Sequence, residues 1–149
     1  MKTLVLYDSL HGNTEKIAKA IGAALTGEVK VLRVGEVNAS ELRSFDLLFV
    51  GAPTHGGRAS PAMSEFLDKV QARGLDGVNV AAFDTRHSHK LTVIFGYAAG
   101  RIAKSLKKKG GTLLLSPQAF YVEGTQGPLR ECELERAAAW AKEVVGSAT

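Results

Sequence analysis

The chain has 149 residues, of which 45% are hydrophobic and 23% charged, a balance that fits one globular domain with a single core. No apolar run approaches the roughly 20 residues needed to cross a bilayer, and the one cysteine, Cys132, excludes an internal disulfide and a Cys-x-x-Cys metal or redox pair. Residues 1–3 lead directly into an apolar strand, so we expect no secretory leader and a cytoplasmic location.

The formal net charge is +4, and the basic residues are unevenly placed. Residues 85–122 contain no Asp or Glu, yet they include Arg86, Lys90, Arg101, Lys104, Lys107, Lys108 and Lys109. Such a basic face can attract nucleic acid, an anionic membrane or an acidic protein, although a solvated helix face without a partner is the plainer interpretation. Because no nucleic-acid motif or interleaved aromatic residue accompanies it, we expect neither nucleic acid nor membrane as a partner.

The first half of the chain predicts three strands and one helix. Residues 3–7 form a continuous apolar strand, the type expected where both faces of a sheet are covered. After a turn at residues 12–14, apolar residues at helical spacing indicate a helix that ends at Gly27; these residues are Ile17, Ile21, Ala24 and Leu25. Residues 29–34 and 46–50 are the second and third predicted strands.

The second half continues the alternation. Ser60 is expected to cap a helix with Pro61 in its first turn and a buried face of Met63, Phe66, Leu67 and Val70. Residues 78–83 are the fourth strand, and the basic helix that follows has an inner face of Ala98, Ala99, Ile102, Ala103 and Leu106. The fifth strand begins at residues 112–115, is interrupted at 116–117 and resumes at 120–122. A last helix is expected to bury Leu134, Ala137, Ala138, Ala141 and Val145, with Trp140 as a packing residue.

Five strands separated by helices predict one domain, residues 1–149, of the α/β class. The architecture is a three-layer α/β/α sandwich around a five-stranded parallel sheet with right-handed crossovers. Ligands of such sheets bind beyond the carboxyl ends of the strands, where the strand order reverses. The loops after the first, third and fourth strands are therefore expected to hold the functional site.

The loop after the first strand has the composition of an anion site. It consists of Ser9, Leu10, His11, Gly12, Asn13 and Thr14, and its amides converge on the N-terminus of a helix. A simple helix cap by Ser9 or Asn13 is the alternative. The sequence contains neither GxxxxGK[ST] nor GxGxxG, which argues against a nucleoside triphosphatase and the usual dinucleotide fold. A phospho-receiver domain would need an aspartate where this chain has Gly51-Ala52.

This loop resembles the flavodoxin signature, in which [ST]-x-T-G-x-T surrounds the phosphate of FMN. Ser9, Gly12 and Thr14 match the pattern, and His11 replaces the usual threonine. The resemblance spans the whole chain and is closest to the short-chain type. It implies FMN as the cofactor and the strand order 2-1-3-4-5, with the flavin at the reversal between strands one and three.

The same resemblance implies two further loops beside the flavin. The loop after strand three contains Pro53, Thr54, His55, Gly56 and Gly57; Thr54 and Gly56 match the family, and His55 occupies the aromatic position, with a surface histidine as the alternative. The third loop departs from the family because it has no stacking tyrosine; it includes Asp84, Thr85, Arg86 and His87. Its amides at Thr85 and Arg86 are expected to bond the ring edge, and Arg86 and Lys90 to raise the potential of the second reduction step.

The leading hypothesis is an FMN-containing electron carrier that exposes a flavin edge to redox partner proteins with an acidic docking face. We expect a monomer or weak dimer. A chain of 149 residues has few residues left to build a substrate pocket over the flavin. The alternatives are an FMN-dependent NAD(P)H quinone reductase and a flavin-free anion-binding or docking module. The spacing of His11, His55, His87 and His89 does not match a metal site, and Cys132 is interpreted as structural.

Overall fold

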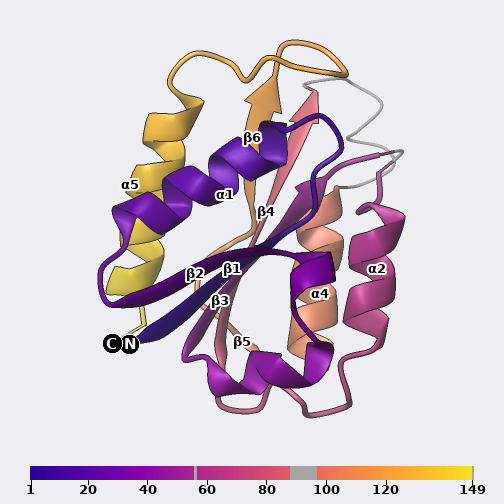
Figure 1. The fold of residues 1–149 in the computed structure, drawn as a ribbon, viewed down its shortest axis with the longest axis vertical. Coiled ribbons are helices and arrows are strands. Elements are labelled where there is room, and N and C mark those ends of the chain that lie inside the picture. Colours follow the sequence, from indigo (N-terminus) through magenta and orange to yellow (C-terminus); the bar gives the residue numbers. More distant parts are fainter. Residues whose placement is uncertain (56, 88–96, 149) are drawn as a thin grey trace.

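A parallel sheet with helices on both faces organises the chain (Figure 1). The computed structural model describes residues 1–55, 57–87 and 97–148. The strands are β1 (Lys2–Tyr7), β2 (Glu28–Arg33), β3 (Leu47–Pro53), β4 (Asn79–His87), β5 (Thr112–Leu113) and β6 (Gln118–Val122). The path β2-β1-β3-β4-β5 confirms the predicted order, and β6 also pairs with β4.

The interrupted fifth strand is two short strands that lie one after the other along β4. β5 pairs with Asn79 and Val80, whereas β6 pairs with residues 83–87. Ser116 and Pro117 lie between them, and proline cannot donate a hydrogen bond to a sheet. The interruption therefore falls where the sequence indicated it.

β4 is longer than predicted and changes the interpretation of the third loop. Asp84, Thr85, Arg86 and His87 belong to the strand, because each pairs with a residue of β6. Asp84 and Thr85 pair with β3 as well, which itself runs on to Pro53. The assignment of these four residues to a loop was wrong. Their polar side chains are typical of a loop, but their backbone continues the sheet.

The helices are α1 (Asn13–Ala24), α2 (Pro61–Asp68), α4 (Ala98–Lys108) and α5 (Glu133–Gly146), with short 3-10 turns at Val34–Glu36 and Ala39–Ser44. Two apolar clusters show which helices share a face. One joins the sheet to α2 and α4, and includes Met63, Phe66, Ala98, Ile102 and Leu106. The other joins it to α1 and α5, and includes Ile17, Ile21, Ala137, Trp140 and Val144. These clusters confirm the three layers.

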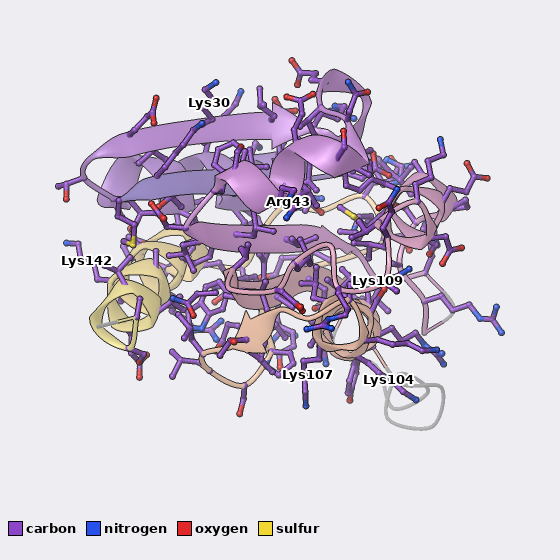
Figure 2. All side chains as sticks on the ribbon, turned by 90° about the horizontal axis from the view of Figure 1, so that it is seen from below. Lys30, Arg43, Lys104, Lys107, Lys109 and Lys142 are labelled. Atoms are coloured by element: carbon purple, nitrogen blue, oxygen red, sulfur yellow. The ribbon has the colours of Figure 1, made fainter. Side chains whose placement is uncertain are left out.

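The basic helix α4 buries the predicted inner face of Ala98, Ala99, Ile102, Ala103 and Leu106. Its outer side carries Lys104, Lys107 and Lys108, all exposed. Figure 2 shows Lys104, Lys107 and Lys109 gathered at this helix. The last turn places lysines beside the negative end of the helix dipole, which favours them there.

One expectation for α5 was wrong. Leu134 is 44% exposed, and the buried face is Glu133, Ala137, Trp140, Ala141 and Val144. In the first turn the inward position belongs to Glu133, whose carboxylate accepts hydrogen bonds from the Tyr121 N–H and from Arg136. Trp140 packs edge-on against Phe49, Phe83 and Phe120, as expected of a packing residue.

Among the helices of the described ranges, none combines the length and apolar character that crossing a bilayer demands.

Candidate functional site

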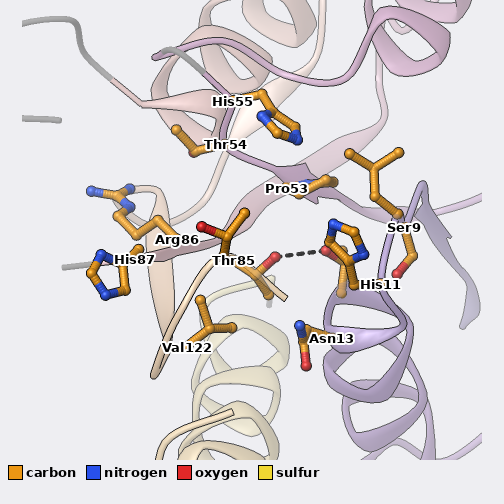
Figure 3. A pocket seen from close by; sticks show the side chains of 13 residues that line it. Ser9, His11, Asn13, Pro53, Thr54, His55, Thr85, Arg86, His87 and Val122 are labelled. Atoms are coloured by element: carbon orange, nitrogen blue, oxygen red, sulfur yellow. Dashed lines mark hydrogen bonds between the residues drawn. The ribbon is translucent and has the colours of Figure 1, made fainter. Parts of the chain in front are cut away.

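A cavity of about 200 Å³ opens at the carboxyl edge of the sheet, where β1, β3, β4 and β6 end (Figure 3). It brings together most of the predicted site residues: Ser9, Leu10, His11, Asn13, Thr14, Pro53, Thr54, His55, Thr85, Arg86 and His87. Because drug-sized ligands occupy about 300 Å³ or more, a ligand as large as a flavin nucleotide would extend over the cavity's rim.

Three predicted residues lie at the site without lining this cavity. Gly12 supplies the turn into α1 with a φ of 89°, a conformation that favours glycine. Gly57 has a φ of 79°, and its carbonyl oxygen accepts a hydrogen bond from Arg101. Asp84 is fully buried behind the cavity wall. Gly56 lies outside the described residues, as do His89 and Lys90.

The structure adds Val122 and Thr125 to the cavity lining. Val122 is the last residue of β6 and Thr125 lies in the loop that follows, at the same edge of the sheet as the loops already predicted. These two residues were not among the predicted site residues. The signal that could have identified them is their position at and after the end of a strand of this edge.

The loop after β1, which lines the cavity, contains backbone N–H groups without partners among the described residues. Ser9 Oγ accepts hydrogen bonds from the N–H groups of Gly12 (3.0 Å) and Glu15 (3.4 Å), so it does cap the start of the helix. Within the described chain, no acceptor binds the N–H groups of Leu10, His11, Asn13 or Thr14. The cap and the anion site are therefore compatible, because one hydroxyl organises the loop and leaves donors for a ligand.

Arg33, which no local sequence pattern indicated, supports this loop from behind. From the end of β2, its guanidinium donates to the Ser9 carbonyl oxygen at 3.1 Å and to Glu15 Oε1 at 3.4 Å. It also lies 3.7 Å from Asp8 Oδ1. The hydrogen bond and charge of Lys19, with a smaller effect of Arg33, lower the pKa of Glu15. Glu15 therefore stays ionised and holds Arg33 against the loop.

Two hydrogen bonds tie this loop to neighbouring segments. The hydroxyl oxygens of Thr14 and Thr85 are 2.7 Å apart and buried, which joins the start of α1 to the end of β4. Asn13 Nδ2 donates to the Gln126 carbonyl oxygen at 3.2 Å, which joins α1 to the loop after β6. The walls of the cavity are thus fixed relative to one another.

A buried carboxylate organises the opposite wall. Asp84 accepts hydrogen bonds from the Thr54 hydroxyl (3.1 Å) and from the Ala99 N–H (2.9 Å). Arg86 donates to both of its oxygens, from Nε at 2.9 Å and from a terminal nitrogen at 2.7 Å. The guanidinium also lies over the Tyr97 ring, 3.3 Å from its centre. We call these residues (Thr54, Asp84, Arg86, Tyr97 and Ala99) the Asp84 cluster.

The open parallel sheet, with its order β2-β1-β3-β4-β5, belongs to the doubly wound α/β class, in which ligands bind beyond the carboxyl ends of the strands. The chain belongs to the flavodoxin domain family, whose model matches residues 4–122. The resemblance noted in the sequence is thereby confirmed.

Relatives identified by sequence agree with this family, and a solved structure agrees with the fold. A flavodoxin of Clostridium saccharobutylicum is 34% identical over 92 residues, covering 59% of this chain and 58% of that protein. An NAD(P)H dehydrogenase (quinone) of Acidovorax ebreus (strain TPSY) is 36% identical over 124 residues, covering 63% and 62%. The chain thus spans about three-fifths of the length of these relatives. Oxidised Flavodoxin 2 from Bacillus cereus has the same fold, with a TM-score of 0.83, 24% identity, and coverage of 98% of this chain and 99% of that one.

Proposed function

We propose that this protein binds FMN at the cavity and transfers electrons through it. The observation that carries the proposal is the set of four unpaired N–H groups at the start of α1, on Leu10, His11, Asn13 and Thr14. Such a cluster suits a phosphate dianion. When bound, the flavin would supply one- and two-electron chemistry.

Different segments of this chain would bind the two ends of FMN. The loop from Ser9 to Thr14 holds the phosphate, while His55 and the end of β4 flank the ring. Thr85 and Arg86 pair within the sheet, with Pro53 and Tyr121 respectively. Their amides are therefore partly committed to neighbouring strands, which makes the phosphate loop the stronger part of the site.

Redox proteins with an acidic docking face are the proposed partners. The excess of basic residues supports this choice, because complementary charge speeds the encounter of two proteins. A small carrier of this kind is proposed to act as a monomer or weak dimer in the cytoplasm, a reducing compartment that suits its single cysteine.

A quinone reductase is the second candidate, favoured by two observations. Relatives named NAD(P)H dehydrogenase (quinone) align with much of the chain. His11, His55 and His87 line the cavity, and histidines can supply the protons that a quinone takes up with two electrons. Oxidation of NADPH by quinone in the presence of the FMN-loaded protein would favour this candidate, and its absence would favour the carrier.

The visible absorption spectrum, recorded before and after FMN is added to the purified protein, tests the leading proposal. Binding should shift the flavin bands and quench flavin fluorescence at a one-to-one ratio. A spectrum equal to the sum of free FMN and protein would contradict it, and would leave the flavin-free anion-binding module in its place.

A further inference from the structure

The helices α2 and α4 lie on the face of the sheet opposite α1 and α5 (Figure 1). A groove lined by residues of both helices lies between them. It consists of two adjoining hollows of about 230 and 510 Å³. Both are lined by Asp68, Arg101 and Ser105, so they form one continuous depression. Small side chains such as Ser105 and Ala72 in the lining leave room for another chain.

The lining of this groove is strongly basic. Its cationic side chains are Arg58, Arg101, Lys104, Lys108 and Lys109, against the single carboxylate of Asp68 among the described residues that line it. Lys109 Nζ donates to the Val70 carbonyl oxygen at 2.6 Å, and Arg101 Nε to that of Gly57 at 2.8 Å. Both acceptors are neutral carbonyl oxygens, and these bonds hold the two side chains in place.

Lys104 and Lys108 are the most available of these cations. Both are exposed, and neither has an ion-pair partner in the part of the chain that the structure describes. With Arg101 they occupy positions i, i+3 and i+7 of α4, so the three lie along one face. A row of positive charge therefore follows the groove.

We propose that this groove binds an acidic segment of a partner protein in extended conformation. At about 1.5 Å of rise per residue, Lys104 and Lys108 are separated by about 6 Å along the helix axis. In an extended segment, side chains on the same face recur about every 6.6 Å. Carboxylates at alternate positions therefore match the lysines, and Asp68 on the other wall can accept a hydrogen bond from a backbone N–H of the segment.

Two other anionic partners fit less well. A membrane surface is normally held by apolar anchors, yet the large apolar side chains exposed in the described chain are Met1, Leu10 and Leu134, and none lies on α2 or α4. Nucleic acid is favoured by aromatic side chains, and no described residue that lines the groove is aromatic. A DNA backbone also has no N–H for Asp68, whose charge repels phosphate.

The groove begins beside the proposed flavin site. Arg58 at its upper end exchanges backbone hydrogen bonds with His55, at 2.8 and 2.9 Å, and His55 lines the cavity. A protein whose acidic segment lies in the groove would thus reach the flavin edge. This link to electron transfer rests on the proposed function, whereas binding in the groove does not.

The experiment measures the fluorescence anisotropy of a labelled peptide in which glutamate alternates with threonine. The double variant K104E/K108E should weaken binding about tenfold or more, because two attractive pairs become repulsive. The matched control K30E/K142E makes the same change in net charge on β2 and α5, away from the groove (Figure 2). It should weaken binding about twofold or less.

Equal weakening of peptide binding by the two double variants would refute binding in the groove, because net charge alone would then explain the affinity. An unchanged affinity in the neutral variant K104Q/K108Q would overturn it as well. If oligothymidylate binds more tightly than the peptide and K104E/K108E abolishes that binding, the partner is a nucleic acid and not an acidic polypeptide. The same result with phosphatidylserine vesicles would make the partner a membrane. FMN affinity should not change in these exposed variants. The unfolding midpoint of K104E/K108E should fall only slightly, because a carboxylate then replaces Lys108 beside the negative end of the α4 dipole. Peptide binding without FMN binding would refute the proposed function alone, and the reverse result would refute the groove alone.

Discussion

The loop from Ser9 to Thr14, which we call the phosphate loop, and the Asp84 cluster lie at the same edge of the sheet. They differ in whether their polar groups have hydrogen-bond partners within the protein. The loop from Ser9 to Thr14 leaves amides without protein partners within the described chain. In the Asp84 cluster, by contrast, a fully buried carboxylate takes hydrogen bonds from Thr54, Arg86 and Ala99. The first region offers its donors to a ligand, whereas the second uses them to hold the wall together.

This difference changes the expectation for the flavin's reduction potential. From the sequence, Arg86 counts as a positive charge beside the ring. In the structure its guanidinium pairs with Asp84 and its side chain is only 11% exposed, so the two charges would act on a bound flavin as a dipole. We therefore expect Arg86 to raise the potential less than an unpaired arginine would, and Lys90 lies outside the described residues.

The largest expected effect tests the phosphate loop. FMN should bind more tightly than riboflavin by about 3–6 kcal/mol, the contribution of two or more charge-assisted hydrogen bonds. This is roughly a hundredfold or more in dissociation constant. Titration of flavin fluorescence against protein measures both constants. Equal affinities would show that the unpaired amides do not contact the phosphate.

The second prediction breaks the Asp84 cluster. Arg86→Met should lower the free energy of unfolding by about 3–5 kcal/mol, because it leaves a buried carboxylate without its ion-pair partner. Urea unfolding measures the loss. Arg73 forms an exposed pair with Asp76, so Arg73→Met is the matched control and should cost about 0–1 kcal/mol. Similar losses in the two variants would mean that the Arg86–Asp84 pair behaves as a surface pair.

The third prediction concerns the hydroxyl that joins the two regions. Thr14→Ala should weaken FMN binding by about 1–3 kcal/mol if its hydroxyl donates to the phosphate. Thr85→Val removes the partner of the 2.7 Å hydrogen bond and keeps the Thr14 hydroxyl, so it should weaken binding less. Isothermal titration with FMN compares them. Equal losses would assign Thr14 a role in positioning the strand rather than in contacting the ligand.

The smallest expected effect concerns the His11 side chain, which lines the cavity. If a ring N–H donates to the phosphate, His11→Ala should weaken FMN binding by about 0.5–1 kcal/mol, the contribution of one hydrogen bond. Isothermal titration with FMN measures the change. An unchanged affinity would show that the His11 ring does not act on the phosphate.

The features that the sequence predicted are those encoded by neighbouring residues. Apolar runs and helical spacing indicated the strands and helices, and Ser9, Gly12 and Thr14 indicated the anion loop. The contacts that escaped prediction join residues distant in the chain: Arg33 to Ser9, 24 positions apart, and Thr54 to Asp84, 30 apart. Such contacts depend on which strands become neighbours in the sheet, so the pattern of residues close together in the sequence does not predict them.

The support that Arg33 gives to the phosphate loop has a consequence for the kinetics of binding. Its bonds to the Ser9 carbonyl oxygen and to Glu15, together with the Ser9 hydroxyl cap, restrain the loop before any ligand arrives. The conformational entropy of that segment is then lost during folding rather than during association. A preorganised loop of this kind should admit its ligand in a single kinetic phase, at a rate set by diffusion and access rather than by a rearrangement of the chain.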